Sequence, residues 1–192
     1  MKYSANTLHL LSQSGLSRIE LQNLQLDPIL KFDIVSTGFG LVGPTGTGKT
    51  IALARMAADY TELLVGDRGE GARYPCGDAI LWMNWPESAE LFKRWAVGGD
   101  PEHSEGIIER AKDVGYLYLD DLGQERSKGE EDLSTGILKE ILDSRYRDGK
   151  PVFWTSNLDK VALANFYGAR TVSRMAEAWP GQRVTGVDMR LK

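Results

Sequence analysis

Cysteine and histidine are scarce in this chain. Its 192 residues include one cysteine, Cys76, and two histidines, His9 and His103, both in polar segments. A single cysteine excludes an internal disulfide, and it has no suitable histidine beside it in the sequence. The sequence therefore argues against thiol catalysis and against a metal site built from cysteine and histidine. Cys76 is interpreted as a bystander.

An excess of positive charge is also lacking. Lys and Arg number 23 against 27 Asp and Glu, which gives a net charge of −4. This balance argues against a protein that coats nucleic acid through bulk positive charge. Any contact with nucleic acid must come from a local basic patch or from several subunits together.

Long apolar runs are absent as well. No stretch of 18 apolar residues occurs, and the first residues are not followed by the apolar core of a signal peptide. We therefore expect a cytoplasmic protein without a membrane segment. With 42% hydrophobic and 26% charged residues, the composition is that of one soluble globular domain.

The sequence does contain a glycine-rich stretch that fits the pattern G-x-x-x-x-G-K-[ST] without a mismatch: Gly43-Pro44-Thr45-Gly46-Thr47-Gly48-Lys49-Thr50. We call residues 43–50 the phosphate loop. Its glycines allow successive backbone N–H groups to point at an anion. Lys49 supplies a positive charge for the β- and γ-phosphates, and Thr50 offers a hydroxyl to Mg²⁺. The pattern thus predicts a site for ATP or ADP with Mg²⁺.

Strands and helices are predicted to alternate around this loop. A strand at 36–42 leads into it and a helix at 49–60 leads out of it. Further strands are expected at 79–84, 116–119 and 152–154 and just after Pro180, with helices at 87–97, 104–113, 130–148, 159–167 and 169–178. This order predicts an α/β fold with a parallel five-stranded sheet covered by helices on both faces. Residues 1–35 are weakly patterned and are interpreted as an N-terminal arm, and 66–77 as a mobile loop.

Two of the predicted helices show a clear apolar side. In 87–97 it consists of Leu91, Phe92 and Trp95. In 130–148 it is formed by Leu133, Ile137, Leu138, Ile141, Leu142 and Tyr146. Residues at these spacings share one face of a helix, so we expect them to face the core.

Paired carboxylates end the strand before the second of these helices. Asp120 and Asp121 follow the apolar residues Leu117 to Leu119. In a protein with a phosphate loop, the first carboxylate holds Mg²⁺ together with Thr50, and the second polarises the attacking water. Without that loop, the pair would be read as the end of a strand and the start of a turn.

Short polar side chains end the next strand. They are Thr155, Ser156 and Asn157. Open α/β sheets bind ligands at the carboxyl ends of their strands, which places Asn157 where it could hydrogen-bond the γ-phosphate and the water. A turn-forming asparagine before Leu158 is the ordinary alternative, and spacing alone does not exclude it.

The order of these motifs resembles that of the DnaC/DnaI-type helicase loaders and the similar IstB transposition helper ATPases, which belong to the AAA+ superfamily. The resemblance covers about residues 36–190 and rests on the phosphate loop and four later segments: 119–126 (LDDLGQER), 141–146 (ILDSRY), 155–158 (TSNL), and Arg170 with 173–175 (SRM). The combination is much more specific than its parts.

The resemblance implies roles for individual residues. Asp120 and Asp121 correspond to the Walker B pair, Asn157 to sensor 1, and Arg174 to an arginine finger that reaches the γ-phosphate of a neighbouring subunit. Hydrolysis would then require assembly into a homo-oligomer. Arg190 corresponds to a C-terminal arginine that contacts the subunit's own nucleotide. Arg145 is a further interface candidate.

The chain departs from the family pattern at both ends. Only about 35 residues precede the first predicted strand, too few for the independent domain with which loaders grip the helicase. Only 18 residues follow Arg174, so a full AAA+ lid domain is not expected. We therefore divide the chain into an arm, 1–35, and an ATPase domain, 36–192.

Contacts with DNA are weakly marked. Lys93-Arg94-Trp95, and Arg68 with Arg73, mix cations and an aromatic ring as single-strand binders do. Residues of these types are more often core residues or solvated charges, so none of them is singled out as a DNA contact. Single-stranded DNA is still expected as a partner.

Several functions agree with the sequence. The first is an ATPase that acts on DNA as a helicase loader or similar replication factor, with a replicative helicase as partner. A transposition helper of the IstB kind, with a transposase as partner, is the second. A DNA-binding scaffold that ATP assembles, with incidental turnover, is a third. A small-molecule kinase shares the loop, but 155–157 and Arg174 argue against it.

Overall fold

The computed structural model describes residues 38–66, 79–98, 101–125 and 132–186. Within them the elements follow in the order β1 (Gly40–Val42), α3 (Lys49–Gly66), β2 (Ile80–Asn84), α4 (Trp85–Gly98), α5 (Pro101–Asp113), β3 (Tyr116–Leu122), α6 (Leu133–Arg147), β4 (Val152–Ser156), α7 (Lys160–Tyr167), α8 (Ala169–Ala178) and β5 (Gly181–Arg183). The predicted arm, Arg190 and all but the first residue of the predicted 66–77 loop lie outside the described residues.

The strands form one parallel sheet in the order β2-β3-β4-β1-β5. The predicted five-stranded parallel sheet is thus confirmed. Because parallel strands run the same way, their carboxyl ends meet at one edge. The phosphate loop after β1, the paired carboxylates of β3 and Asn157 after β4 are therefore brought to the same edge, although they are distant in sequence.

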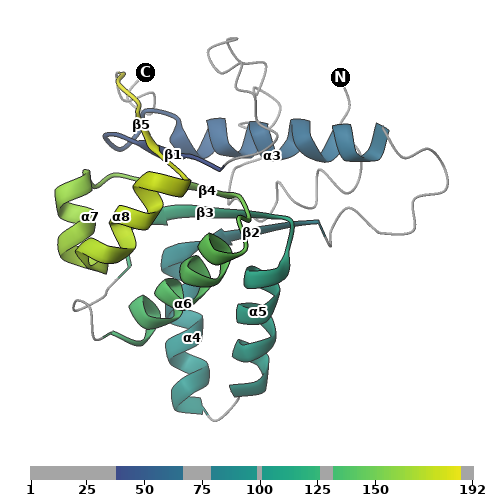
Figure 1. Ribbon diagram of the computed structural model, residues 1–192, viewed down its shortest axis with the longest axis vertical. Helices are drawn as coiled ribbons and strands as arrows, with labels where there is room; N and C mark the ends of the chain where they lie inside the picture. The colour runs from purple at the N-terminus through teal and green to yellow at the C-terminus, as the bar shows by residue number, and fades with distance from the viewer. Residues whose placement is uncertain (1–37, 67–78, 99–100, 126–131, 187–192) are drawn as a thin grey trace.

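Helices cover both faces of the sheet, as predicted. α3 lies along one face, and α4, α5, α6, α7 and α8 lie on the other (Figure 1). Alternate strand residues serve the two layers because successive side chains point to opposite faces. Trp82, Tyr118 and Phe153 pack with α3, whereas Leu81, Leu117 and Val152 pack with the opposite layer.

Local signals account for several helix boundaries. Asp132 precedes α6 and accepts a hydrogen bond from the N–H of Ser134 at 2.9 Å. Asp159 caps α7 as predicted, accepting from the N–H of Ala162 at 2.8 Å. Gly168, with a φ of 87°, separates α7 from α8 in a conformation that a residue with a Cβ rarely adopts. The predicted bounds of α8 are confirmed.

Other boundaries and faces differ from expectation. β3 continues past Leu119 to Leu122, and α5 begins at Pro101 rather than at Ser104. Leu91 is 39% exposed and Leu133 is 47% exposed, so their assignment to the core was wrong. Periodicity marks the side of a helix but not where the packed core ends, and Leu133 is the first residue of α6. Among the described residues, no helix has the length and apolar character needed to cross a membrane.

Candidate nucleotide-binding site

The phosphate loop connects β1 to α3 in the conformation that its glycines predict. Gly46 and Gly48 have φ angles of 79° and 82°, in the left-handed region that favours glycine. The hydroxyl of Thr47 donates to the carbonyl of Pro44 at 2.9 Å, within the loop. Because α3 begins at Lys49, the positive end of its dipole lies at the loop, which favours a phosphate there.

The side chain of Lys49 is buried and connects the segments that follow β1 and β4. Its Nζ donates to the carbonyls of Gly43 and Pro44 at 2.9 and 2.8 Å, and to Oδ1 of Asn157 at 2.6 Å. Lys49 and Asn157 are 108 positions apart in the sequence. The structure thus brings together a residue of the phosphate loop and the residue assigned to sensor 1.

Asp120 is the centre of a second set of hydrogen bonds. Its Oδ1 accepts from the hydroxyl of Thr155 at 2.6 Å and from the hydroxyl of Thr50 at 3.1 Å. Asp120 is 1% exposed, so its carboxylate is held in place by contacts inside the protein. The two residues predicted to hold Mg²⁺, Thr50 and Asp120, are therefore in direct contact.

Burial changes the acidity of Asp120. Its pKa is raised to about 6, mainly by loss of solvation and also by the nearby charge of Asp121, while the hydrogen bonds from Thr155 and Thr50 oppose the shift. A carboxylate that is costly to ionise when alone is stabilised by a nearby cation. A hydroxyl and a carboxylate oxygen are ligands that Mg²⁺ accepts, so this pair fits the predicted metal.

Asp121 has an unusual backbone for a residue with a Cβ. Its φ is 60°, and among the described residues it is the one non-glycine with a positive φ. Its N–H donates to the hydroxyl of Thr155 at 2.8 Å. Strained backbones of this kind cluster at functional sites, which agrees with the catalytic role predicted for Asp121.

Arg174 lies elsewhere, on α8. Its guanidinium donates to the carboxylate of Asp143 on α6 and lies 5.4 Å from the ring centroid of Tyr146. The bond to Asp143 raises the pKa of Arg174, which therefore stays charged. The side chains of Arg174 and Asp143 are 25% and 43% exposed. These contacts are made on the sheet face opposite α3, so the described contacts of Arg174 do not include the phosphate loop.

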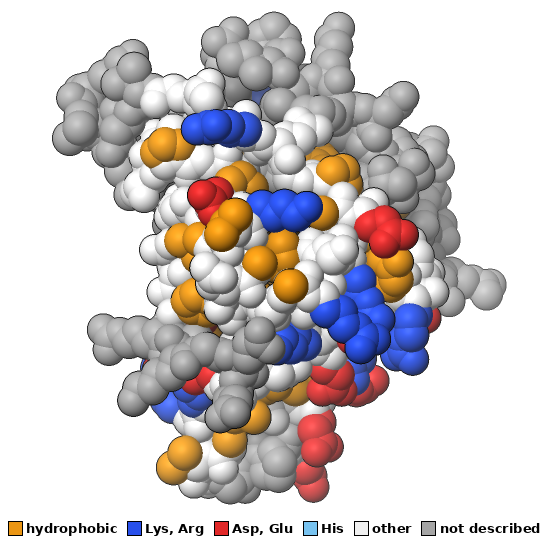
Figure 2. Space-filling model, turned by 60° about the vertical axis from the view of Figure 1, so that its left-hand side comes forward, with side chains coloured by type: hydrophobic (Ala, Val, Ile, Leu, Met, Phe, Trp, Pro, Cys, Tyr) orange, Lys and Arg blue, Asp and Glu red, His pale blue; other side chains and the backbone are white. Residues whose placement is uncertain are grey.

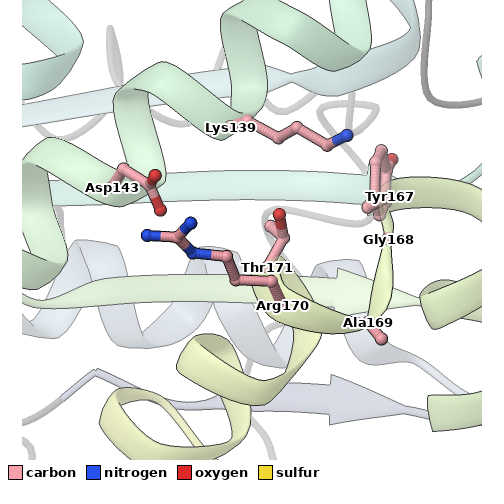
Figure 3. Close-up of a pocket in the computed structure, with 7 residues that line it drawn as sticks. All are labelled: Lys139, Asp143, Tyr167, Gly168, Ala169, Arg170 and Thr171. Atoms are coloured by element: carbon pink, nitrogen blue, oxygen red, sulfur yellow. The ribbon is translucent and has the colours of Figure 1, made fainter.

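A pocket of about 330 Å³ lies beside this pair, between α6 and the start of α8. Figure 3 shows Lys139 and Asp143 on one wall, and Arg170 with Thr171 on the other. The pocket is not at the phosphate loop, and we do not identify it with the nucleotide site. The side of the molecule that carries α7 and α8 presents Lys and Arg among hydrophobic side chains (Figure 2).

Comparisons with known proteins identify the fold. No protein-family model and no curated protein matches this sequence. The crystal structure of the DnaC helicase loader matches with a TM-score of 0.56 and 20% identity, over 96% of this chain and 93% of that chain. The crystal structure of DnaI matches with a TM-score of 0.55 and 26% identity, over 89% and 80%. This chain has the AAA+ fold.

The replication initiator DnaA has the same AAA+ core. A structure of DnaA bound to AMPPCP and single-stranded DNA matches with a TM-score of 0.58 and 15% identity, over 97% of this chain. The match covers 48% of the DnaA chain, so this protein spans about half of that relative. At such identities the likeness concerns the fold.

Glu125 is a buried residue for which the sequence predicted no role. It was named only as part of the 119–126 segment. Its carboxylate accepts from Nε1 of Trp85 at 2.9 Å, from the N–H of Gly123 at 2.9 Å and from the hydroxyl of Tyr167. Burial and the charge of Glu125 raise the pKa of Tyr167 well above its usual value. Glu125 thereby ties the turn after β3 to the start of α4 and the end of α7.

Arg145 corrects an expectation. It is fully buried on α6, so its assignment as an interface residue was wrong. Its guanidinium donates to five carbonyl oxygens, those of Ala111, Lys112, Val114, Gly115 and Pro151. The first three end α5 and the turn after it, where helical carbonyls lack partners within the helix. Burial lowers the pKa of Arg145 to about 10, so it remains charged at neutral pH.

The candidate DNA contacts gain no support as a group. Lys93 is ion-paired with Asp132 at 3.2 Å. The ring of Trp95 packs edge-on against His103 with centroids 4.9 Å apart. Arg94 is exposed on α4. The other two candidates, Arg68 and Arg73, lie outside the described residues.

Proposed function

We propose that this protein is an ATP-binding AAA+ ATPase that assembles into a homo-oligomer and acts on DNA as a replication factor of the helicase-loader kind. The observation that carries the nucleotide part is the pair of contacts at the carboxyl edge, Lys49 with Asn157 and Thr50 with Asp120. The DNA part is supported by the likeness to DnaC, DnaI and DnaA and by the order of the sequence motifs.

The phosphate loop would bind the nucleotide. Backbone N–H groups of the loop and of the start of α3 would donate to the phosphates, and Lys49 would supply them with a positive charge. Asn157 already contacts Lys49, so a γ-phosphate near Lys49 would also lie near Asn157. A nucleoside triphosphate is therefore favoured over a diphosphate, because its γ-phosphate supplies a partner for both Lys49 and Asn157.

Thr50 and Asp120 would hold Mg²⁺, and this contact is supported by their hydrogen bond of 3.1 Å. When bound, the ion supplies positive charge that offsets the charge on the phosphate oxygens. Asp121, one residue further along β3, is proposed to orient the attacking water and to accept its proton. Asn157 is proposed to orient the same water from β4.

Arg174 would complete the site of a second subunit. A planar guanidinium stabilises charge that is spread over phosphoryl oxygens, and such arginines supplied by a neighbour have large effects on rate. Arg174 is half-buried and is held by Asp143, on the face opposite α3. A single subunit would therefore bind ATP but hydrolyse it slowly.

The test is the rate of ATP hydrolysis over a series of protein concentrations, with and without single-stranded DNA. We expect the rate per subunit to rise with protein concentration, because the site is completed by a neighbour, and to rise further with DNA. A rate that is independent of both would contradict assembly and action on DNA, while leaving the nucleotide site in place.

The matched control is Lys49→Ala. It removes the charge that faces the phosphates, so nucleotide binding should be lost, as measured with a fluorescent ATP analogue. Circular dichroism should show that the variant remains folded. If Lys49→Ala binds ATP as tightly as the native protein, the phosphate loop is not the nucleotide site.

A further inference from the structure

Thr155 makes two hydrogen bonds to the paired carboxylate residues. It lies on β4 and is completely buried. Its hydroxyl donates to Oδ1 of Asp120 at 2.6 Å and accepts the N–H of Asp121 at 2.8 Å. The one hydroxyl therefore donates a hydrogen bond to the side chain of Asp120 and accepts one from the backbone of Asp121.

These bonds lie at an irregularity in the sheet. Leu119 pairs with Trp154 and Leu122 pairs with Ser156, so two residues of β3 face one residue of β4. Such a bulge leaves an extra residue without its normal ladder partners and redirects the side chains around it. The two residues of β3 inside the bulge are Asp120 and Asp121, and the single residue of β4 is Thr155.

The hydroxyl of Thr155 replaces the missing ladder contact. Without it, the part-buried N–H of Asp121 would keep only the carboxylate of Asp120 as a partner, and a buried donor with poor hydrogen bonding is costly. The bond also helps to hold the backbone of Asp121 at its unusual φ of 60°. Such a conformation persists only where surrounding contacts stabilise it. The same hydroxyl fixes Oδ1 of Asp120, the atom that also accepts from Thr50.

We propose that Thr155 is a positioning residue, which holds the β3 bulge so that Asp120 stays against Thr50 while Asp121 keeps its left-handed backbone. The inference rests on the proposed ATPase function for its catalytic meaning. Thr155 itself contacts neither the phosphate loop nor Asn157 by any described hydrogen bond. It acts through the two aspartates, and its hydroxyl rather than its size is the required feature.

Thr155→Val and Thr155→Ser separate these two properties. Valine keeps the branched shape but lacks the hydroxyl, and serine keeps the hydroxyl but lacks the methyl group. We expect Thr155→Val to lower kcat by roughly 10- to 100-fold with KM for ATP changed less than about two-fold, and to weaken Mn²⁺ binding by about 10-fold. Thr155→Ser should restore both values to within about three-fold of the native protein.

Two readouts do not depend on catalysis. Mn²⁺ binding in the presence of AMPPCP is measured by electron paramagnetic resonance. Hydrogen exchange of the Asp121 amide is measured by NMR, and this amide should exchange faster in Thr155→Val than in the native protein. AMPPCP affinity without metal should be unchanged, because the phosphate loop is intact. Thr135→Val, at a buried threonine of α6, controls for the general cost of the same substitution.

The outcomes are distinct. If Thr155→Val folds and keeps native kcat, Mn²⁺ affinity and Asp121 exchange, the proposal is overturned. If Thr155→Ser is as impaired as Thr155→Val, packing rather than the hydroxyl is responsible, and the proposal is again overturned. Should valine prevent folding, Thr155→Ala is measured with the same readouts. If the native protein does not hydrolyse ATP at all, the ATPase proposal fails, while Mn²⁺ binding and amide exchange still test Thr155.

Discussion

The β3–β4 edge and the α6–α8 surface each hold a carboxylate against a hydrogen-bond donor, but they differ in burial. Asp120 at the edge is 1% exposed and accepts from two hydroxyls. Asp143 on the surface is 43% exposed and pairs with Arg174, which is 25% exposed. In the first region water cannot replace a lost partner, and in the second it can.

This difference in burial separates contacts that are fixed within one subunit from contacts that a neighbouring subunit can replace. A buried carboxylate keeps its geometry because every alternative leaves a polar group unpaired in a low dielectric. An exposed ion pair is screened by water and salt and contributes little to stability. Arg174 can therefore exchange Asp143 for another anion at small cost, as the proposed role in a neighbouring site requires.

The largest effect that would test the comparison is expected from Arg174→Ala. ATP affinity should be unchanged, whereas turnover in the assembled protein should fall by roughly 10³-fold, because the charge on the phosphoryl oxygens loses its partner. Binding is measured with a fluorescent ATP analogue and turnover with a phosphate-release assay. Arg110→Ala on α5, an exposed arginine outside the site, is the control.

Mixing two inactive variants sharpens this test. Lys49→Ala subunits lack the nucleotide site but keep Arg174, and Arg174→Ala subunits have the reverse defect. A mixture should recover part of the native rate if the arginine acts across subunits. Normal turnover by Arg174→Ala alone would show that Arg174 has no catalytic role.

Glu125→Leu should have the largest effect on stability. Two buried donors, the indole of Trp85 and the hydroxyl of Tyr167, would lose their carboxylate, whereas the N–H of Gly123 would keep the hydroxyl of Tyr167. We expect the free energy of unfolding to fall by about 3 to 4 kcal/mol. Urea denaturation measures it, with Glu109→Leu on the surface of α5 as the control, expected within about 0.5 kcal/mol. A loss below 1 kcal/mol at Glu125 would mean that removing a buried carboxylate costs no more stability than removing an exposed one.

The acidity of Asp120 predicts a pH dependence of stability. Its pKa is about 6 in the folded protein and about 3.9 in an unfolded chain, so the folded state holds the proton more tightly. As pH rises from 4 to 6, the protein without metal or nucleotide should lose about 2 kcal/mol of stability relative to Asp120→Asn. Urea denaturation of both proteins from pH 4 to 7.5 measures the difference. A difference that does not change with pH would contradict the raised pKa.

Asp143→Asn should have the smallest effect. The denaturation midpoint should stay within error, because the pair is exposed. Removing the charge frees Arg174, so the protein concentration that gives half the maximal ATPase rate should fall by about two- to three-fold at low salt. The native protein should approach the variant at high salt, where the pair is screened. A higher half-maximal concentration would show that Asp143 helps assembly instead of competing with it.

Some features were accessible from the sequence because they depend on neighbours along the chain. The phosphate loop was recognised from its glycines. In the structure, two of them, Gly46 and Gly48, have positive φ angles. Asp159 was recognised as a helix cap, and α8 was predicted with its observed bounds. Each of these signals is complete within a few residues, so no knowledge of the tertiary contacts was required.

Other features required contacts between distant segments. Arg145 was taken for an interface residue because its spacing on α6 does not reveal that carbonyls after α5 and before β4 surround it. Glu125 and Thr155 lie in segments that carry the family resemblance, but the sequence assigned no role of its own to either residue. Their importance comes from burial against donors and acceptors that lie on other elements, which residue type and spacing do not encode.

The sequence by itself determined the order of strands and helices, the phosphate loop and the residues that we propose to bind phosphate and metal. These follow from local backbone preference, side-chain chemistry and the period of the apolar residues. Only the tertiary structure decided that Lys49 meets Asn157 and that Thr155 lies opposite both aspartates. The physical reason is strand register: a hydrogen bond needs its atoms within about 3 Å, and a shift of one residue between β3 and β4 would turn the side chain of Thr155 to the other face of the sheet.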